Sequence, residues 1–274
     1  MKPLVVASIL AGLASPALAE PGDPVFDPMS LRRQTPLSTF SFDFGFEVWD
    51  DPAGTDTSVY TINVAGQFVN DRGLGAYFTL PLTYLSFETP LIDDSDMALG
   101  NIEVGGIFTK YFGRTALVMN AGLGLPTASD DGVSSLQIVG AFTRLTDLPL
   151  RVTSSTWLRL GVSPMGRAGS FLWRIDAGLD LALDEDNVDQ LSPIFHLNVG
   201  AGVDLGGAQL LGELVNVFSD SNGDDDASTF SFGARFSSGN LRPGIALLLP
   251  IDLDSADTFE WALLASLAVR TPSL

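Results

Sequence analysis

The sequence predicts an all-β protein, a transmembrane antiparallel up-and-down β-barrel of 12 strands, with 14 strands as the alternative. Three observations indicate this fold class. Apolar and polar residues alternate along most of the chain with the two-residue period of a strand. The clearest alternating segments are about 10 to 13 residues long, which suits strands that cross a bilayer at a tilt. Aromatic residues collect near the segment ends, as in the girdles of membrane barrels.

A soluble exported barrel or sandwich is the alternative fold, because alternation looks the same when inside and outside are exchanged. The composition of the polar face argues against it. That face holds Gly, Asn, Ser, Thr and charges of both signs, which suits a wet lumen better than a solvent surface rich in Lys and Glu. We therefore expect the apolar face to contact outer-membrane lipid.

Residues 1–19 have the pattern of a signal peptide. A basic residue precedes an apolar run from Leu4 to Ala14, and an A-L-A tripeptide forms a cleavage site before Glu20. We expect export through this cleaved peptide and a location in the outer membrane of a Gram-negative envelope. Residues 20–37 are Pro-rich and aperiodic, which predicts an N-terminal tail at or inside one mouth of the barrel.

The barrel is expected over residues 38–270, followed by a C-terminal tail at 271–274. Its first strand, at 40–49, has phenylalanine at four alternate positions. Pro81 in the third strand indicates a bulge, and the acidic stretch at 88–99 is expected to be a loop. The expected strands lie, in order, at 40–49, 59–69, 75–87, 100–111, 115–125, 135–144, 151–163, 171–184, 194–205, 209–218, 229–236, 244–251 and 258–270.

These segments number 13, whereas single-chain bacterial barrels have an even number of strands. One segment must therefore be wrong. The weak patterns between residues 135 and 170 are where we expect the error, because short and long connections stop alternating there.

Composition excludes several classes of function. Removing Lys2 with the signal peptide takes the net charge from -19 to -20, which argues against a nucleic-acid partner. The chain has no cysteine, so disulfides, thiolate metal sites and cysteine nucleophiles are ruled out. The single histidine, His196, excludes a multi-histidine metal site. We expect no cofactor, no dedicated metal site and no catalytic residue.

Three motifs resemble a known family. They are L-G-N-I-E-V-G-G at 99–106, N-A-G-L-G-L-P-T at 120–127 and L-G-E-L-V-N at 211–216. They are similar to the strand start, loop entry and late-strand glutamate of outer-membrane barrels of the MetA-pathway phenol-degradation or transporter type. The match covers roughly residues 99–216, and Ala128 stands where the family prefers glycine. The resemblance implies a barrel that takes up small, often aromatic compounds.

The polar phase of the strands gives the residues expected to line a pore. Buried charges need partners, so we expect arginine–acid pairs to shape the lumen. Acids outnumber arginines in this phase, which predicts a preference for cations or neutral solutes, with Arg174 at the constriction. The candidates are Asp43, Glu47, Glu103, Arg159, Arg174, Asp176, Asp180, His196, Asn198, Glu213 and Arg235.

The function expected from these residues is a channel or transporter for small, aromatic or apolar solutes. A closed structural or interaction barrel without transport is the alternative, and the sequence leaves the oligomeric state open. An outer-membrane hydrolase is less favoured, because His196 has no serine two residues further on, where the active sites of barrel phospholipases would need one. Acidic loops at 93–96, 184–186 and 220–226 are weak candidates for binding divalent cations.

Overall fold

The computed structural model describes residues 25–49, 56–88, 93–128, 132–183, 192–219, 226–252 and 259–271. These residues form thirteen strands and two 3₁₀ helices. In chain order they are β1 (Thr39–Trp49), β2 (Asp56–Val69), β3 (Leu74–Glu88), β4 (Asp93–Leu99), β5 (Glu103–Phe112), β6 (Thr115–Gly124), η1 (Gly132–Ala141), η2 (Leu145–Arg151), β7 (Trp157–Ala168), β8 (Phe171–Ala182), β9 (Ile194–Asp204), β10 (Ala208–Ser219), β11 (Ala227–Phe236), β12 (Leu241–Asp252) and β13 (Phe259–Arg270).

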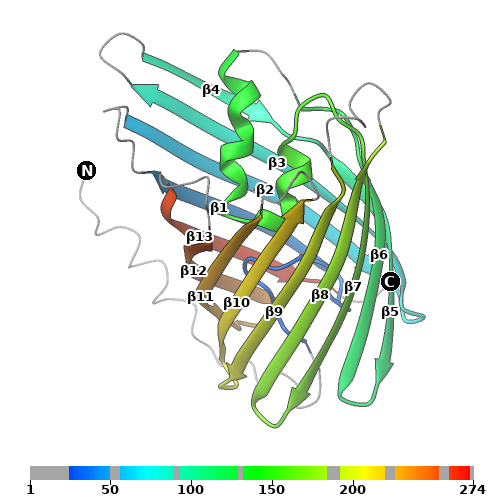
Figure 1. The fold of residues 1–274 in the computed structure, drawn as a ribbon. Coiled ribbons are helices and arrows are strands. Elements are labelled where there is room, and N and C mark those ends of the chain that lie inside the picture. Colours follow the sequence, from blue (N-terminus) through cyan, green and yellow to red (C-terminus); the bar gives the residue numbers. More distant parts are fainter. Residues whose placement is uncertain are drawn as a thin grey trace.

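The strands close into an antiparallel barrel. Neighbouring strands pair in antiparallel fashion around the ring, and β1 completes it by pairing with both β2 and β13 (Figure 1). One position in the ring is shared by two strands, because residues 82–88 of β3 pair with β4 and residues 74–79 pair with β5. The described strands therefore form a 12-stranded barrel with one extra strand, and the predicted fold class is confirmed.

The strand that pairs with β3 is interrupted between β4 and β5, opposite Pro81. Proline has no N–H to donate to a strand ladder. Here the carbonyl of Pro81 accepts a hydrogen bond from the Gly100 N–H at 2.9 Å. The next side chain, Asn101, turns away from the ladder and donates from Nδ2 to the carbonyls of Val152, at 2.7 Å, and Ser155, at 3.2 Å. At this interruption, the β6–β7 connection is hydrogen-bonded to the barrel wall through Asn101.

The strand expected at 135–144 is wrong. This part of the chain contains most of η1 and the step into η2, because β6 and β7 pair directly with each other and leave no edge for a strand between them. Ten residues of weak alternation do not separate a strand from a short helix. The next strand begins at Trp157 rather than at 151, since Arg151 still belongs to η2. The loop expected at 88–99 is also wrong, because β4 lies within it.

The two ends of the barrel differ in their connections. At the short-turn end, the five hairpins β2–β3, β5–β6, β7–β8, β9–β10 and β11–β12 have turns of two to four residues. Gly73 and Gly206 occupy two of these turns with φ of 78° and 85°, a conformation that favours glycine. At the long-loop end, residues 125–156 connect β6 to β7. Membrane barrels have short turns on the periplasmic side and long loops outside, so this asymmetry orients the molecule.

The outer face of the barrel is apolar and the inner face is polar. Phe42, Phe232 and Leu267 point outward, with exposed fractions of 44%, 60% and 43%. An aromatic group also lies on this face, where the ring of Tyr60 is 5.2 Å from that of Phe46. An apolar band of this size is typical of a surface in contact with lipid. Among the described residues, no helix has the length and hydropathy needed to cross a bilayer.

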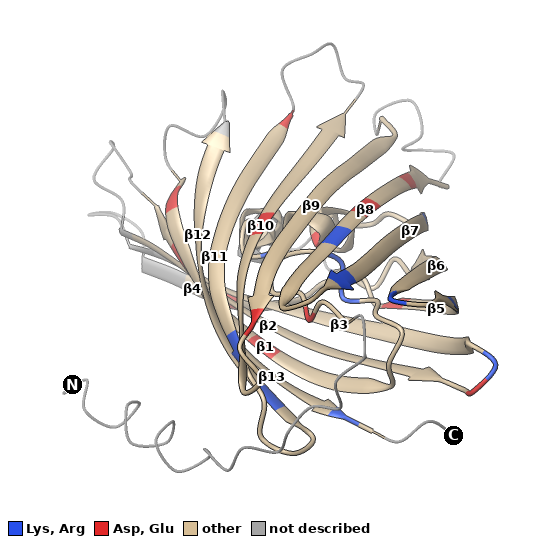
Figure 2. Cartoon of the chain, turned by 90° about the horizontal axis from the view of Figure 1, so that it is seen from below, with Lys and Arg blue, Asp and Glu red and all other residues tan. Residues whose placement is uncertain are grey.

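Residues 25–38, here called the inserted segment, fill much of the lumen from the short-turn end. The segment begins there, where Asp27 forms an ion pair with Arg270 at 2.8 Å. It extends to Arg32, which contacts Asp180 of β8 at 2.9 Å, and it returns to Ser38, which hydrogen-bonds Val69 at the end of β2. The segment lies within the ring of strands (Figure 2). The N-terminal tail that the sequence predicts thus contributes a loop inside the barrel.

The helices η1 and η2, here called the lumen helices, enter from the long-loop end (Figure 1). Apolar side chains of the inserted segment pack with side chains of η2 and the strands. This mixed core within the lumen includes Phe26, Met29, Leu31, Leu145, Trp157, Leu172, Leu211 and Val215.

Candidate solute pathway in the barrel lumen

Wall side chains hydrogen-bond the backbone of the inserted segment at several points. Glu213 of β10 accepts hydrogen bonds from the N–H groups of Met29, Ser30 and Leu31 at 2.7, 2.5 and 3.0 Å. Its carboxylate also accepts the Ser30 hydroxyl at 2.7 Å. A carboxylate that accepts several N–H groups is a strong, charge-assisted anchor. Glu213 therefore binds a bend of the segment without relying on particular side chains there, apart from the serine.

Three further wall side chains bind the backbone of the segment. Gln67 of β2 accepts from the Thr35 N–H at 3.3 Å and donates to the Thr35 carbonyl at 2.8 Å. Gln209 of β10 accepts from the Asp27 N–H at 3.3 Å. Arg235 of β11 donates to the Pro28 carbonyl at 2.7 Å. The segment is thus bound to the wall both near its beginning, at Asp27 and Pro28, and near its end, at Thr35.

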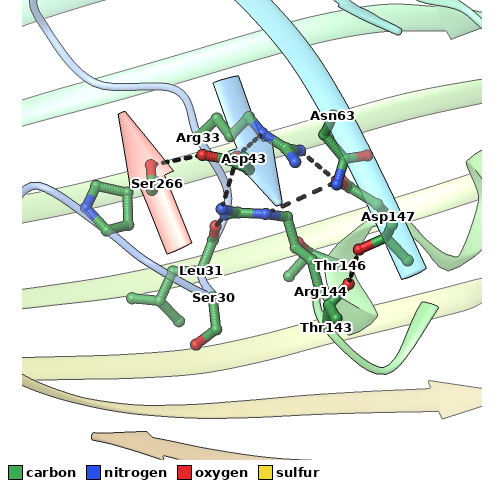
Figure 3. Close-up of polar contacts among 12 residues, drawn as sticks. Ser30, Leu31, Arg33, Asp43, Asn63, Thr143, Arg144, Thr146, Asp147 and Ser266 are labelled. Atoms are coloured by element: carbon green, nitrogen blue, oxygen red, sulfur yellow. Dashed lines mark hydrogen bonds and ion pairs between the residues drawn. The ribbon is translucent and has the colours of Figure 1, made fainter. Parts of the chain in front are cut away.

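The Asp43 cluster, made of Arg33, Asp43, Arg144 and Asp147, lies beyond these anchors (Figure 3). Asp43 of β1 contacts Arg33 at 3.2 Å and Arg144 at 3.3 Å. Arg33 also forms a short ion pair with Asp147 of η2. Ser266 of β13 donates its hydroxyl to Asp43 at 2.5 Å. The cluster joins the wall, the inserted segment and the lumen helices in one network.

Burial and neighbouring charges shift the pKa values of Arg144 and Asp147, the two members of this cluster in the β6–β7 connection. Burial alone raises the pKa of Asp147, but Arg33 and Arg144 outweigh that effect and hold it at about 2. Burial and the adjacent Arg33 lower the pKa of Arg144 to about 10, against the opposing effect of Asp43. Asp147 and Arg144 are therefore both charged at neutral pH.

The Asp180 cluster lies beside it and contains Arg32, Glu103, Arg159, Asp180 and His196. Asp180 of β8 contacts Arg32 at 2.9 Å, Arg159 at 3.4 Å and the Nε2 of His196 at 2.6 Å. Arg159 also contacts Glu103 at 2.5 Å. These side chains connect β5, β7, β8 and β9 to the inserted segment, and each is buried.

The structure places all eleven predicted lumen residues on the inner face, where each is buried. Most belong to the contacts above, and four do not. Arg174 and Asp176 form a separate pair at 2.7 Å, and Asn198 accepts a hydrogen bond from the Asn216 N–H at 2.9 Å. Glu47 accepts the Thr143 N–H at 2.9 Å. Arg174 is thus paired within β8, away from the Asp43 cluster.

The strand pattern does not predict several residues that lie in the lumen. They come from the inserted segment and η2, which have no period of two. The adjacent Arg32 and Arg33 are the only basic residues at positions 20–37 and are the available signal, since buried arginines require acidic partners. The residues missed in this way are Arg32, Arg33, Arg144, Asp147 and Arg151.

Three cavities lie beside the inserted segment. A cavity of about 500 Å³ opens at the short-turn end beside Leu37, Arg72 and Lys110. A cavity of about 50 Å³ lies deeper, between the inserted segment and the β1–β3 and β13 wall. A third, of about 10 Å³, lies between the two clusters, with Asp147 and Arg159 in its lining. All three are lined in part by the inserted segment, and the second and third share Arg33, Gln34 and Thr79 in their linings.

The acidic loops proposed as weak cation sites fall largely outside the described residues. This applies to the side chains at 93–94 and to residues 184–186 and 220–225. In the part of the chain that the structure describes, there is no group of three or more His, Cys, Asp or Glu side chains that could hold a metal ion.

Comparison with solved structures defines the class of this fold. No protein-family model matches the chain, and no curated protein matches it. Solved structures do match, and they include outer-membrane channels and porins. The chain therefore has the fold of an outer-membrane β-barrel. The particular MetA-pathway resemblance has no support from a family model and stays a prediction.

The COG4313 outer membrane channel from Pseudomonas putida F1 is similar over 90% of this chain and 100% of that one, with a TM-score of 0.63 and 11% identity. The NanC porin is similar over 85% of this chain and 100% of that one, with a TM-score of 0.52 and 8% identity. The KdgM porin matches over 85% and 99%, with a TM-score of 0.50 and 10% identity. At these identities the likeness defines the fold and leaves the solute open.

Proposed function

We propose that the protein is an outer-membrane channel for small solutes. The inserted segment and the lumen helices close the lumen at rest, and passage requires a shift of the inserted segment. The observation that carries this proposal is how the segment is held. Side chains such as Glu213 and Gln67 bind it, and no described strand pairs with it.

This mode of attachment allows movement without unfolding the wall. A hydrogen bond within a protein contributes about 0.5–1.5 kcal/mol net, because water replaces it when it breaks, and one to a charged group about 1.5–3 kcal/mol. The strand ladders between β1 and β13 do not involve the segment and stay intact when it shifts. A loop inside a complete barrel is therefore the part best suited to open and close.

The solutes we propose are small and include aromatic or apolar compounds. The motifs at 99–106 and 120–127 support this class through their resemblance to phenol-pathway barrels. The mixed core adds a physical reason, because movement of Phe26, Met29 and Leu31 exposes apolar surface inside the lumen. An apolar solute gains free energy by covering such surface.

A closed structural barrel is the second candidate, and the small size of the two inner cavities favours it. Removal of the inserted segment distinguishes the two functions. We expect a variant lacking residues 26–35 to keep the barrel and to show a single-channel conductance several-fold above that of the intact mature chain. Slower gel migration after boiling, which reports a folded barrel, is the control. A folded variant that conducts no better than the intact chain would support the structural barrel.

A further inference from the structure

Arg235 is a buried guanidinium without an acidic partner. It projects inward from β11 and is 5% exposed. Its three hydrogen-bond acceptors are neutral, namely the carbonyls of Pro28 and Arg242, at 2.7 and 3.0 Å, and the hydroxyl of Ser266, at 3.0 Å. Among the residues that the structure describes, no carboxylate lies within ion-pair distance of it. Asp43 shares Ser266 with Arg235 but acts on it only beyond ion-pair distance, so the buried guanidinium keeps an attraction for a further anion.

The 50 Å³ cavity brings Arg235 together with Arg33 and Arg144. Two carboxylates, Asp27 and Asp43, also line it, and both are engaged. Asp27 is paired with Arg270 at 2.8 Å, and Asp43 is shared between Arg33 and Arg144. The lining of this cavity thus holds three guanidinium groups and two carboxylates, an excess of one positive charge, while Asp147 pairs with Arg33 from outside the lining.

Two of the three arginines also have a buried N–H group without a partner. These are Nη2 of Arg33 and Nε of Arg235, whereas Nε of Arg144 makes no hydrogen bond but lies 3.8 Å from Asp147. Buried donors normally have an acceptor. Residues that line the cavity therefore carry donors without an acceptor as well as excess positive charge.

We propose that this cavity is a binding site for a small monovalent anion, either a free halide or the carboxylate group of a solute. The volume sets the size of the ligand, because on this measure a buried water needs about 10–15 Å³. About 50 Å³ therefore holds a halide or a carboxylate group together with a few waters. The site deepens the proposed function, on which its role in transport rests, because it places an anion-selecting point beside the inserted segment.

This inference reverses the cation preference expected from the sequence. That expectation depends mainly on Glu47, Glu103, Asp180 and Glu213. Glu103 and Asp180 form ion pairs and Glu213 binds the inserted segment, so these three charges are not free to attract a cation. Glu47 accepts the Thr143 N–H and has one oxygen without a hydrogen bond. The charge near the passage is instead set by arginines, two of which lie outside the strands.

Crystals of the mature chain grown in sodium bromide test binding directly, through anomalous scattering from bromide. We expect a peak between Arg33, Arg144 and Arg235 that is lost in Arg235→Gln and kept in Arg235→Lys, which retains the charge. Arg114→Gln is the matched control, because Arg114 is exposed in a short turn. Arg144→Gln, in the β6–β7 connection, serves if Arg235→Gln does not fold. No peak in the mature chain, or an equal peak in Arg235→Gln, would overturn the proposal.

Two further experiments distinguish a halide from a carboxylate as the ligand, and anion binding from transport. Sodium formate added to the bromide crystals removes the peak if a carboxylate is a ligand of the site, and leaves it if the site takes halides alone. Reversal potentials across a KCl gradient test transport. We expect anion preference in the mature chain and its loss in Arg235→Gln. A bromide peak in a barrel that does not conduct would retain the site and reject the channel.

Discussion

Arg33 forms an ion pair with Asp147, and this contact joins the segment that enters the lumen from the short-turn end to the helix that enters from the long-loop end. The two residues are 114 positions apart in the chain. Both also contact Arg144 or Asp43 (Figure 3), so movement of the inserted segment disturbs η2 as well. The closed lumen is therefore one network rather than two independent obstructions.

Glu213→Gln is expected to raise the open probability of the proposed channel. Glutamine has one carbonyl acceptor and no charge, so it loses part of a contact in which hydrogen bonds to a charged group contribute about 1.5–3 kcal/mol. A loss of about 1.4 kcal/mol corresponds to a tenfold higher open probability in planar-bilayer recordings. Glu260→Gln, at an exposed position of β13, is the matched control and should leave the recordings unchanged. Equal open probabilities in the two variants would argue that Glu213 does not hold the closed state.

Asp147→Asn should lower stability and flatten its dependence on acid pH. The pKa of Asp147 is about 2 in the folded protein, below its ordinary value of 3.8. Its charged form therefore stabilises the fold fully at pH values above 3.8. This contribution is lost as the pH falls through about 2. The shift corresponds to roughly 2 kcal/mol. We expect the variant to unfold more easily at pH 7 and to lose the slope between about pH 4 and 2, as measured by urea unfolding in micelles.

The control for this measurement is Asp71→Asn, at an exposed position of the β2–β3 turn. It carries the same change of charge without a buried partner. If Asp71→Asn and Asp147→Asn altered the acid limb equally, the Arg33–Asp147 contact would not be the cause.

Leu267→Arg should destabilise the barrel, because Leu267 faces outward and a charge there must leave water. The loss is about 2–4 kcal/mol if the position lies at mid-bilayer depth. The measurement is unfolding in lipid vesicles. For Gly178→Ser, on the inner face, the strand pattern predicts a mild effect. The structure changes that expectation, since a Cβ at Gly178 would lie 2.6 Å from Arg32 Nη2 and would push the inserted segment. A stability loss for Gly178→Ser without one for Leu267→Arg would contradict the lipid-facing assignment.

Gly45→Ala should displace the β6–β7 connection from the wall. A Cβ at this inner position of β1 would collide with Thr61 and Thr143. Thr143 donates its N–H to Glu47, so its displacement loosens the step between η1 and η2. We expect a larger conductance in bilayer recordings. Gly106→Ala is the control, because a Cβ there would lie 4.0 Å from the nearest atom, a carbonyl oxygen, and unchanged currents in both variants would reject a role for the close contact at Gly45.

The strand pattern predicts much of the wall, including the inward direction of all eleven lumen candidates. That success has a local cause, because successive side chains of a strand point to opposite faces whatever the strand pairs with. The pattern fails at 88–99 and 135–144. β4 is a strand although its sequence is rich in aspartate, and η1 is a helix although its sequence is largely apolar. Their structures depend on which segments of the barrel lie next to them.

The sequence by itself determined the class of fold, through alternation and segment length, and the separation of an apolar outside from a polar inside. Only the tertiary structure decided how the lumen is filled and which charges meet. Glu213 and Ser30 are 183 residues apart, and Asp43 and Ser266 are 223 apart. No local period encodes such contacts, because they depend on barrel closure and on where an aperiodic segment enters. The charge along the proposed pathway is therefore a property of the closed barrel, whereas the acidic net charge of the chain is a property of its composition.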